Sequence, residues 1–217
     1  MFKTIQNFIL QQKNRQTPAS SHSAKSLFEF WNTQGLANVI PPDTEHPAGW
    51  NEVHFLQKVM TLIGKPDAKI VEIGCGYGRL CGTFEPANYM GCDINAQAIK
   101  QAKTNFPDHH FTTIDYTQPY PTSDISLAYT VLLHIPDTLI EQTVQNLCEA
   151  SNSILIVEIL GQKWRKPNHR VPVFNRERHE YELFFAKHNH TLQVEIKKPY
   201  LRYPNTDISF LWFEKMK

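Results

Sequence analysis

Short apolar runs alternate with amphipathic stretches over the last two thirds of the chain, and this alternation predicts the fold. The stretches between the runs have the spacing of amphipathic helices, so each run is interpreted as a buried strand. Strands joined by helices build a parallel sheet that is covered on both faces. The runs expected to form strands are 69–73, 89–92, 110–114, 125–130 and 153–159, and the helices between them are 77–84, 95–105 and 136–148.

The C-terminal part of the chain departs from this alternation. A helix is expected around 176–188, and two β-rich runs follow at 191–197 and 207–213. Because no helical pattern separates those two runs, they are expected to pair in antiparallel fashion at the edge of the sheet. The predicted fold class is therefore α/β, with a doubly wound, mostly parallel seven-stranded sheet whose last strand is antiparallel.

The N-terminal part of the chain is expected to be helical. Apolar residues recur at helical spacing within 2–9, a second helix is expected over 24–31, and a third over 51–63, after a proline-rich loop. We expect residues 1–66 to form a helical cap and residues 67–217 to form the main domain. The first helix should pack on the domain or on a second subunit, which leaves a homodimer open, and membrane-surface binding is the less favoured interpretation.

Composition limits the classes of function. The 217 residues are 41% hydrophobic with a formal net charge of +1, so the chain can bury its own core and its global charge does not indicate nucleic acid. The four cysteines lack C-x-x-C spacing, and no His/Cys cluster resembles a metal site. They are expected to be reduced thiols in a cytoplasmic protein. No apolar run is long enough to span a bilayer, and the N-terminus lacks the cleavage pattern of a signal peptide.

A glycine-rich turn follows the first strand, at Gly74, Gly76 and Gly78. Arg79 stands where the dinucleotide fingerprint needs its last glycine, and its side chain would block the close approach of a pyrophosphate. No Gly-Lys-Ser/Thr follows, which excludes a phosphate-binding Walker loop. Glu72, two residues before the turn, would repel a pyrophosphate but suits a positive charge. The turn therefore favours a cationic nucleoside ligand without phosphates.

An ordered set of segments extends beyond the turn. Asp93 follows the second strand, Asp115 and Tyr116 end the third, and 129–137 follows the fourth. Together with 71–79 and the terminal antiparallel pair, this set resembles the class I S-adenosylmethionine-dependent methyltransferases. The resemblance covers 69–213, and it implies S-adenosylmethionine as cofactor and S-adenosylhomocysteine as product.

The resemblance also implies roles for the matching positions. Glu72 would lie near the amino group of the cofactor, Asp93 would accept hydrogen bonds from both ribose hydroxyls, and Ile94 would pack on the adenine. Asp115 could accept from the adenine amino group, although its segment could also be a simple turn. The other positions implied at the cofactor are Gly74, Cys75, Gly76 and Gly78 along the methionine part, Tyr116 beside the adenine, and Tyr129 and Thr130 below the sulfonium.

His134 is the candidate catalytic base, because it follows the fourth strand at the mouth of the expected site and an ordinary histidine titrates near neutral pH. The alternative is a structural residue of a common family segment, and Tyr129 and Asp137 are weaker candidates for the base. Basic and aromatic residues gather between 162 and 179, where they form either a solvated loop or a site for phosphate or carboxylate. The candidate acceptor-binding residues are Arg165, Arg170, Arg176 and, in the N-terminal loop, Trp50, for which core packing is the alternative.

The sequence therefore predicts a methyltransferase that acts on a small or medium acceptor through oxygen, with transfer to nitrogen left open. An anionic acceptor, such as a phosphorylated sugar, a nucleotide-linked sugar or a carboxylated metabolite, suits the basic segment. Nucleic acid is not the expected partner. The alternatives are an RNA methyltransferase that holds phosphates with this segment, and a non-catalytic partner protein that binds S-adenosylmethionine.

Overall fold

The structure is a computed structural model, and it describes residues 29–32, 45–115, 117–167, 171–200, 203 and 205–217. Residues 29–32 are helical, in line with the helix expected over 24–31. The first expected helix, most of the proline-rich loop, Tyr116 and Arg170 lie outside the described residues.

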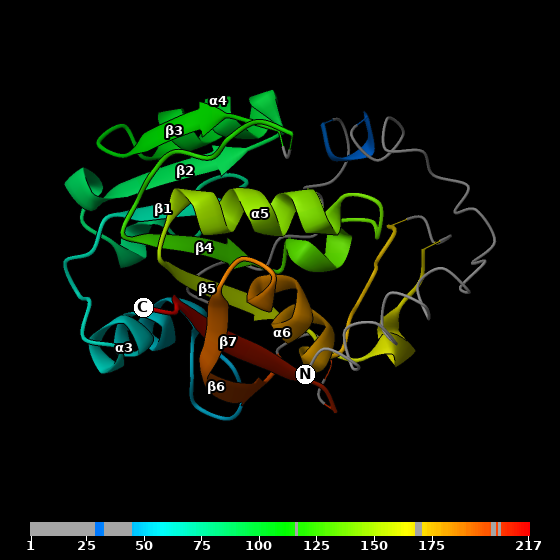
Figure 1. The fold of residues 1–217 in the computed structure, drawn as a ribbon. Helices are drawn as coiled ribbons and strands as arrows, with labels where there is room; N and C mark the ends of the chain where they lie inside the picture. Colours follow the sequence, from blue (N-terminus) through cyan, green and yellow to red (C-terminus); the bar gives the residue numbers. More distant parts are fainter. Residues whose placement is uncertain (1–28, 33–44, 116, 168–170, 201–202, 204) are drawn as a thin grey trace.

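A seven-stranded sheet forms the centre of the protein (Figure 1). Its strands are β1 (Ile70–Ile73), β2 (Tyr89–Asp93), β3 (His110–Thr113), β4 (Ile125–Tyr129), β5 (Ser153–Glu158), β6 (His190–Pro199) and β7 (Asp207–Lys215). They lie in the order β3-β2-β1-β4-β5-β7-β6, and every neighbouring pair is parallel except the two that include β7. The predicted mostly parallel sheet with an antiparallel last strand is confirmed.

The strand order changes direction between β1 and β4. From β1 the chain moves to β2 and β3 on one side, and it then returns to β4 and β5 on the other. Ile73 at the end of β1 pairs with Cys92 of β2 and with Ala128 of β4, so the carboxyl ends of these strands lie side by side. Parallel sheets bind their ligands beyond the carboxyl ends of the strands at such a point, so the fold places a site there.

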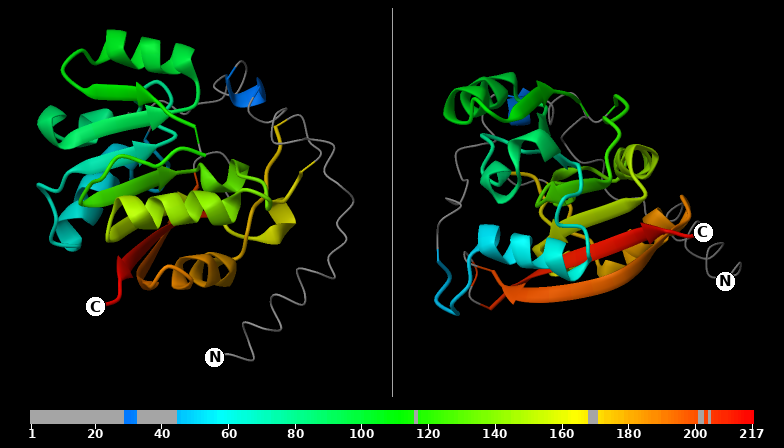
Figure 2. Two further views of the ribbon diagram at one scale, coloured as in Figure 1. Left: turned by 45° about the horizontal axis from the view of Figure 1, so that its top comes forward. Right: turned by 90° about the vertical axis from the view of Figure 1, so that its left-hand side faces the viewer.

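Helices cover both faces of the sheet (Figure 2). They are α3 (Glu52–Leu62), α4 (Ala96–Asn105), α5 (Ile140–Ala150) and α6 (Arg178–Ala186). Leu56 of α3 packs in the same core as Leu127 of β4, whereas Leu147 of α5 and Phe185 of α6 pack with Ile156 of β5 on the other face. Successive strand residues point to opposite faces, so strands covered on both sides need continuous apolar runs, as the sequence shows.

The prediction of a helix over 77–84 is wrong. The structure has a turn followed by two short 3-10 helices, η1 (Cys81–Thr83) and η2 (Pro86–Asn88). Gly78 has a φ angle of 80°, which a right-handed helix does not contain, and the chain reaches β2 only a few residues later. The other helices and strands within the described ranges differ from the predicted bounds only at their ends.

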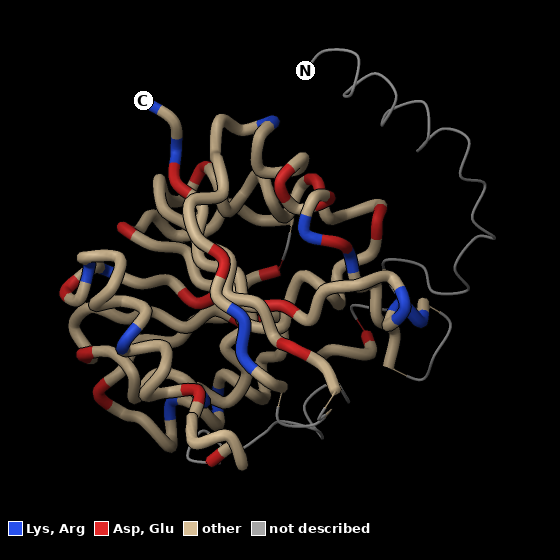
Figure 3. Tube along the Cα trace, turned by 90° about the horizontal axis from the view of Figure 1, so that it is seen from below, with Lys and Arg blue, Asp and Glu red and all other residues tan. Residues whose placement is uncertain are grey.

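Two negative findings apply to the described residues. Among them, no helix has the length and apolar character needed to cross a membrane, and no group of three or more His, Cys, Asp or Glu side chains could hold a metal ion. All four cysteines are buried and free. Acidic and basic residues are interspersed along the described trace in the view of Figure 3.

Candidate functional site

The glycine-rich turn after β1 is held at the carboxyl end of β2. The N–H groups of Gly74 and Cys75 both donate to the Cys92 carbonyl oxygen, at 2.7 and 3.0 Å. Gly74 has a φ angle of 77°, and a Cβ atom built on it would lie 2.3 Å from Cγ2 of Val131, in the loop after β4. Both the positive φ and this contact exclude a side chain at Gly74. The turn is thus packed between β2 and the loop after β4, at the point where the strand order of the sheet changes direction.

Asp93 ends β2 with its carboxyl group against this turn. It is 8% exposed; Oδ2 accepts a hydrogen bond from the Gly76 N–H at 2.7 Å, and Oδ1 accepts one from the Asn95 N–H at 2.8 Å. Burial raises the pKa of the Asp93 carboxyl group, and the backbone N–H donors oppose that shift. Each carboxylate oxygen can accept a second hydrogen bond. The two oxygens can therefore receive two neighbouring hydroxyl groups, such as those of a ribose.

Glu72 of β1 is a second buried carboxyl group close to the turn. It is 3% exposed, and the Tyr89 hydroxyl donates to its Oε2 at 2.5 Å. Burial raises the pKa of Glu72 to about 7, against the opposing effects of the Tyr89 hydrogen bond and the Arg79 charge. A carboxyl group in this state ionises readily when a cation comes close. Glu72 and Asp93 together suit a cationic nucleoside, whereas a phosphate would meet two acidic groups.

Arg79, directly after the turn, contacts the protein's own residues. Its guanidinium forms an ion pair with Glu52 in the first turn of α3 and lies 4.9 Å from the ring centroid of Tyr129. The two charged side chains are 14% and 7% exposed, so the pair ties α3 firmly to the glycine turn. Tyr129, which the sequence analysis placed below the sulfonium, is buried in the core that includes α3. No motif connects Glu52 with Arg79, so the sequence analysis missed this pair.

Other residues expected at the cofactor lie around the same edge of the sheet. Ile94 is half-buried directly after β2. Asp115 follows β3, and its Oδ1 accepts from the Thr117 N–H at 2.7 Å, so it forms a local turn of the kind that the sequence left open. Thr130 follows β4 with a φ angle of 54°, which costs a non-glycine residue about 1–2 kcal/mol. Strained backbone of this kind is concentrated at functional sites, so Thr130 stays a candidate.

His134 is the last residue of η3 (Leu132–His134), the short helix that follows β4. Its Nδ1 lies 3.1 Å from the Pro172 carbonyl oxygen, so Nδ1 must donate and Nε2 must hold the lone pair. The ring centroid lies 4.4 Å from that of Trp31. Burial lowers the pKa of His134 to about 4, which corrects the ordinary value assumed from the sequence. At pH 7 the ring is neutral and can accept a proton, although it is a weaker base than free histidine.

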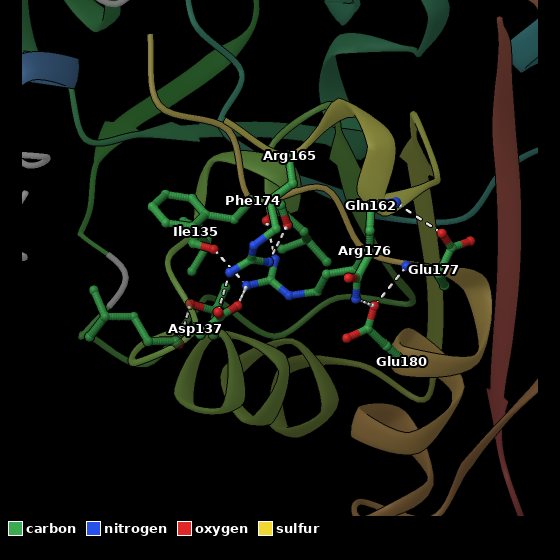
Figure 4. Close-up of polar contacts among 11 residues, drawn as sticks. Ile135, Asp137, Gln162, Arg165, Phe174, Arg176, Glu177 and Glu180 are labelled. Atoms are coloured by element: carbon green, nitrogen blue, oxygen red, sulfur yellow. Dashed lines mark hydrogen bonds and ion pairs between the residues drawn. The ribbon is translucent and has the colours of Figure 1, made fainter. Parts of the chain in front are cut away.

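The arginines expected to bind an acceptor are bonded to the protein's own groups (Figure 4). Arg176 is 1% exposed, and its guanidinium donates to two backbone carbonyls of the loop after β4 and to Asp137. Arg165 forms an ion pair with the same carboxylate. Trp50 is buried and stacked on His46, with ring centroids 5.8 Å apart. The prediction that Arg176 and Trp50 bind an acceptor is therefore corrected, because both side chains are buried inside the protein. Of the predicted acceptor-binding residues that the structure describes, Arg165 has a partly exposed side chain.

Glu158, the last residue of β5, is a buried acid that the sequence analysis missed. It is fully buried, and burial raises the pKa of its carboxyl group to about 8, although hydrogen bonds from backbone N–H groups and the charge of Arg176 oppose the shift. A sequence signal for it existed. An acid near the end of an otherwise apolar strand lies at the same edge of the sheet as Asp93, where ligands bind.

The fold and the site together define the class: a Rossmann-like α/β protein whose switch point suits a cationic nucleoside. Comparisons with known proteins agree with this class. Residues 70–152 match the family model of a methyltransferase domain.

Curated relatives are O-methyltransferases. The chain is 32% identical over 108 residues to a ubiquinone biosynthesis O-methyltransferase of Rhodopseudomonas palustris (strain HaA2), and this match covers 45% of the chain and 42% of that protein. It is 24% identical over 180 residues to the enzyme of the same name from Bradyrhizobium sp. (strain ORS 278), with coverage of 72% and 69%. The chain thus spans less than half the length of the first of these relatives.

Solved methyltransferase structures have the same fold. A magnesium protoporphyrin IX methyltransferase from Synechocystis with bound S-adenosylhomocysteine has a TM-score of 0.63 at 14% identity, with 76% of this chain and 82% of that one covered. An S-adenosylmethionine-dependent methyltransferase from Clostridium acetobutylicum also has a TM-score of 0.63, at 7% identity, with 76% and 91% covered. Residues 70–152 thus match a methyltransferase-domain model, and the fold is the Rossmann-like fold of S-adenosylmethionine-dependent methyltransferases such as these.

Proposed function

We propose that the protein transfers a methyl group from S-adenosylmethionine to a hydroxyl group of a small, anionic acceptor. The observation that carries this proposal is the pair of buried carboxyl groups, Glu72 and Asp93, on adjacent strands around the glycine turn. The curated relatives support transfer to oxygen, because they are named O-methyltransferases.

The residues around the turn fit the cofactor. When bound, S-adenosylmethionine supplies a methyl group that its sulfonium makes reactive. Glu72 would attract the amino group, the two oxygens of Asp93 would receive the ribose hydroxyls, and Ile94 would cover the adenine. Asp115 would lie near the adenine amino group, and Thr130 would line the floor of the site. The backbone of the glycine turn comes close to the methionine part because Gly74 has no side chain.

Binding of S-adenosylhomocysteine is expected to strengthen as the pH rises from 6 to 8. The pKa of Glu72 is about 7 in the free protein, so its carboxyl group is mostly protonated at pH 6 and mostly ionised at pH 8. Only the ionised form attracts the ligand's amino group, so the affinity should rise roughly tenfold over this range. Isothermal titration calorimetry at pH 6, 7 and 8 measures the rise, and Glu72→Gln should remove it. A flat profile in the unmodified protein contradicts the role given to Glu72.

His134 is proposed to accept the proton of the acceptor hydroxyl. The hydrogen bond to Pro172 leaves the lone pair on Nε2, and the lowered pKa keeps the ring in its proton-accepting form throughout the neutral range. The contact with Trp31 brings the described helical segment, residues 29–32, against this ring. That segment would help to exclude water from the reacting groups.

The charge of the acceptor is inferred from the segment after β5. Arg165 and Lys163 lie there, with Arg165 paired to the half-exposed Asp137 and Lys163 5.4 Å from the ring centroid of Trp164. A phosphate or carboxylate could replace Asp137 at Arg165, because a guanidinium binds such groups through two parallel hydrogen bonds. Phosphorylated sugars, nucleotide-linked sugars and carboxylated metabolites all carry a suitable anion.

Methyl transfer can be tested with isotope-labelled S-adenosylmethionine and a panel of phosphorylated, carboxylated and uncharged hydroxyl compounds. We expect label to enter an anionic member of the panel. His134→Ala should lower kcat about a hundredfold with unchanged affinity for S-adenosylhomocysteine, because a positioned base typically contributes about a hundredfold or more. His54→Ala, which removes an exposed histidine of α3, is the control and should retain full activity.

The other outcomes of this experiment are distinct. Label that enters RNA alone would favour an RNA methyltransferase. Cofactor binding without transfer to any acceptor would favour a non-catalytic partner protein. Full activity of His134→Ala would remove the proposed base and leave the methyltransferase assignment in place.

A further inference from the structure

The loop of residues 131–137, in the connection between β4 and α5, is bonded by two buried ionisable side chains that approach different backbone groups. This loop carries His134 and begins next to the strained residue Thr130. It is irregular apart from the single turn of η3, so most of its backbone groups have no partner in a helix or a strand. Glu158 of β5 and Arg176, just before α6, supply many of the missing partners.

Glu158 accepts hydrogen bonds from three successive N–H groups of the loop. Its Oε1 receives those of Val131 at 3.1 Å and Leu132 at 2.7 Å, and its Oε2 receives that of Leu133 at 3.2 Å. The side chain is fully buried. Since β5 pairs directly with β4, the carboxyl group lies at the point where the chain leaves the sheet. Glu158 therefore satisfies the donors at the start of η3, which have no partner within that helix.

Arg176 satisfies the carbonyl groups of the same loop. Its Nη1 donates to the Leu132 carbonyl oxygen at 2.9 Å, and its Nη2 donates to the Ile135 carbonyl oxygen at 2.9 Å and to Asp137 at 2.8 Å. Figure 4 shows the planar guanidinium among these groups. N–H groups of the loop thus donate to the carboxyl group of Glu158, and carbonyl groups of the loop accept from the guanidinium of Arg176.

The segment before α6 runs beside the loop and holds Arg176 in place. The Phe174 N–H donates to the Leu133 carbonyl oxygen at 2.6 Å, and the Arg176 carbonyl oxygen receives the Gly161 N–H at 3.0 Å. Pro172 of this segment accepts the hydrogen bond of His134 Nδ1. The orientation of His134 is therefore set by the same segment that carries Arg176.

We propose that Glu158 and Arg176 are positioning residues for methyl transfer, and that they hold the loop 131–137 so that His134 meets the acceptor hydroxyl. This inference rests on the proposed function, because it takes His134 as the proton acceptor. Stability alone does not explain a buried guanidinium and a buried carboxyl group here, since apolar side chains of similar volume often stabilise a core equally well. A displacement of about 1 Å at a catalytic group can lower a rate about a hundredfold, so the loop has reason to be fixed.

Arg176→Lys tests the proposal while it keeps the positive charge. An ammonium group lacks the planar fork, so it cannot reach both carbonyl groups and Asp137 at once. We expect kcat to fall about a hundredfold with unchanged affinity for S-adenosylhomocysteine, because Asp93 and the glycine turn are untouched. Arg178→Lys is the matched control: Arg178 lies two residues further on, is 52% exposed, and pairs with Glu182 and Glu195 at the surface. It should keep both kcat and affinity.

A second readout does not depend on activity. The imidazole of His134 can be titrated by NMR, with its signal assigned by its loss in His134→Gln. In the unmodified protein it should titrate near pH 4, and in Arg176→Lys its pKa should move toward 6.5, because a loosened loop admits water to the ring. Asp137→Asn removes the half-exposed carboxylate that pairs with both Arg176 and Arg165 and leaves the backbone contacts of Arg176 in place, so it should fold normally and show a smaller shift in the same direction.

Two results would overturn the proposal. One is an Arg176→Lys variant with unchanged kcat and unchanged His134 titration. The other is an equal loss of kcat and of cofactor affinity with the His134 pKa unchanged, which indicates a purely structural role. Failure of the proposed function is separate: the unmodified protein would then methylate no acceptor, while the NMR titration would still report whether Arg176 fixes His134.

Discussion

Replacing Asp93 by alanine is expected to cause a large loss of affinity for S-adenosylmethionine and S-adenosylhomocysteine. The Asp93 carboxyl group is buried at the end of β2, and each of its oxygens already accepts one backbone N–H and can accept one ribose hydroxyl. A hydrogen bond to a charged group contributes about 1.5–3 kcal/mol, so the loss of two should weaken binding about a hundredfold or more. Calorimetric titration with S-adenosylhomocysteine measures the change.

Two further variants separate the loss of contacts from a damaged turn. Asp93→Asn keeps an oxygen acceptor for the backbone and removes the charge, so it should fold normally and bind about tenfold more weakly than the unmodified protein. Asp108→Ala removes an exposed aspartate in the turn before β3 and should bind normally. Affinity of Asp93→Ala equal to that of the unmodified protein would show that the ligand site lies elsewhere.

Gly74→Ala is expected to destabilise the protein and to remove cofactor binding with it. The positive φ of 77° disfavours alanine, and the new methyl group would meet Cγ2 of Val131 at 2.3 Å. The conformation costs about 1–2 kcal/mol and the overpacking about 1–3 kcal/mol, so the free energy of unfolding should fall by about 2–5 kcal/mol. Displacement of Val131 would also disturb the loop that carries His134. Urea unfolding followed by circular dichroism measures the stability.

Gly82→Ala is the matched control for this prediction. Gly82 lies in η1, in the same connection between β1 and β2, and a Cβ atom on it would meet nothing within 4 Å. Its stability should stay within about 1 kcal/mol of the unmodified protein, with normal binding. Equal stability of the Gly74→Ala and Gly82→Ala variants would argue against the tight contact between the glycine turn and the loop after β4.

The sheet and the cofactor side of the site could be predicted because local patterns encode them. A strand buried on both faces must be apolar at every position, and Ile70–Ile73 is such a run apart from Glu72. Turns with positive φ angles favour glycine, so Gly74 was visible in the sequence, and the acid after β2 had a defined place relative to it. The structure confirms the fold class, and the match of residues 70–152 to a methyltransferase-domain model agrees with the expected cofactor.

The acceptor side could not be predicted because it depends on contacts between distant segments. In the sequence, Arg176 is one member of a basic cluster. In the structure it is buried against a loop that lies about forty residues earlier in the chain, and the carbonyl oxygens of Leu132 and Ile135 accept hydrogen bonds from its guanidinium. The lowered pKa of His134 comes from burial, which a sequence pattern does not show. The helix expected over 77–84 does not form because Gly78 has a positive φ angle. A Cβ atom at Gly78 would also meet Phe106 and Phe111, so the turn packs tightly against these two rings.

The central claim is that the glycine turn, Glu72 and Asp93 form a site for S-adenosylmethionine. Calorimetric titration of the unmodified protein with S-adenosylhomocysteine at pH 8, with NAD⁺ titrated in parallel, tests it most directly. We predict saturable binding of one S-adenosylhomocysteine per chain and no binding of NAD⁺, because Arg79 replaces the last glycine of the dinucleotide fingerprint and the two strands beside the turn carry the buried acids Glu72 and Asp93. Binding of NAD⁺ with no binding of S-adenosylhomocysteine would contradict the account.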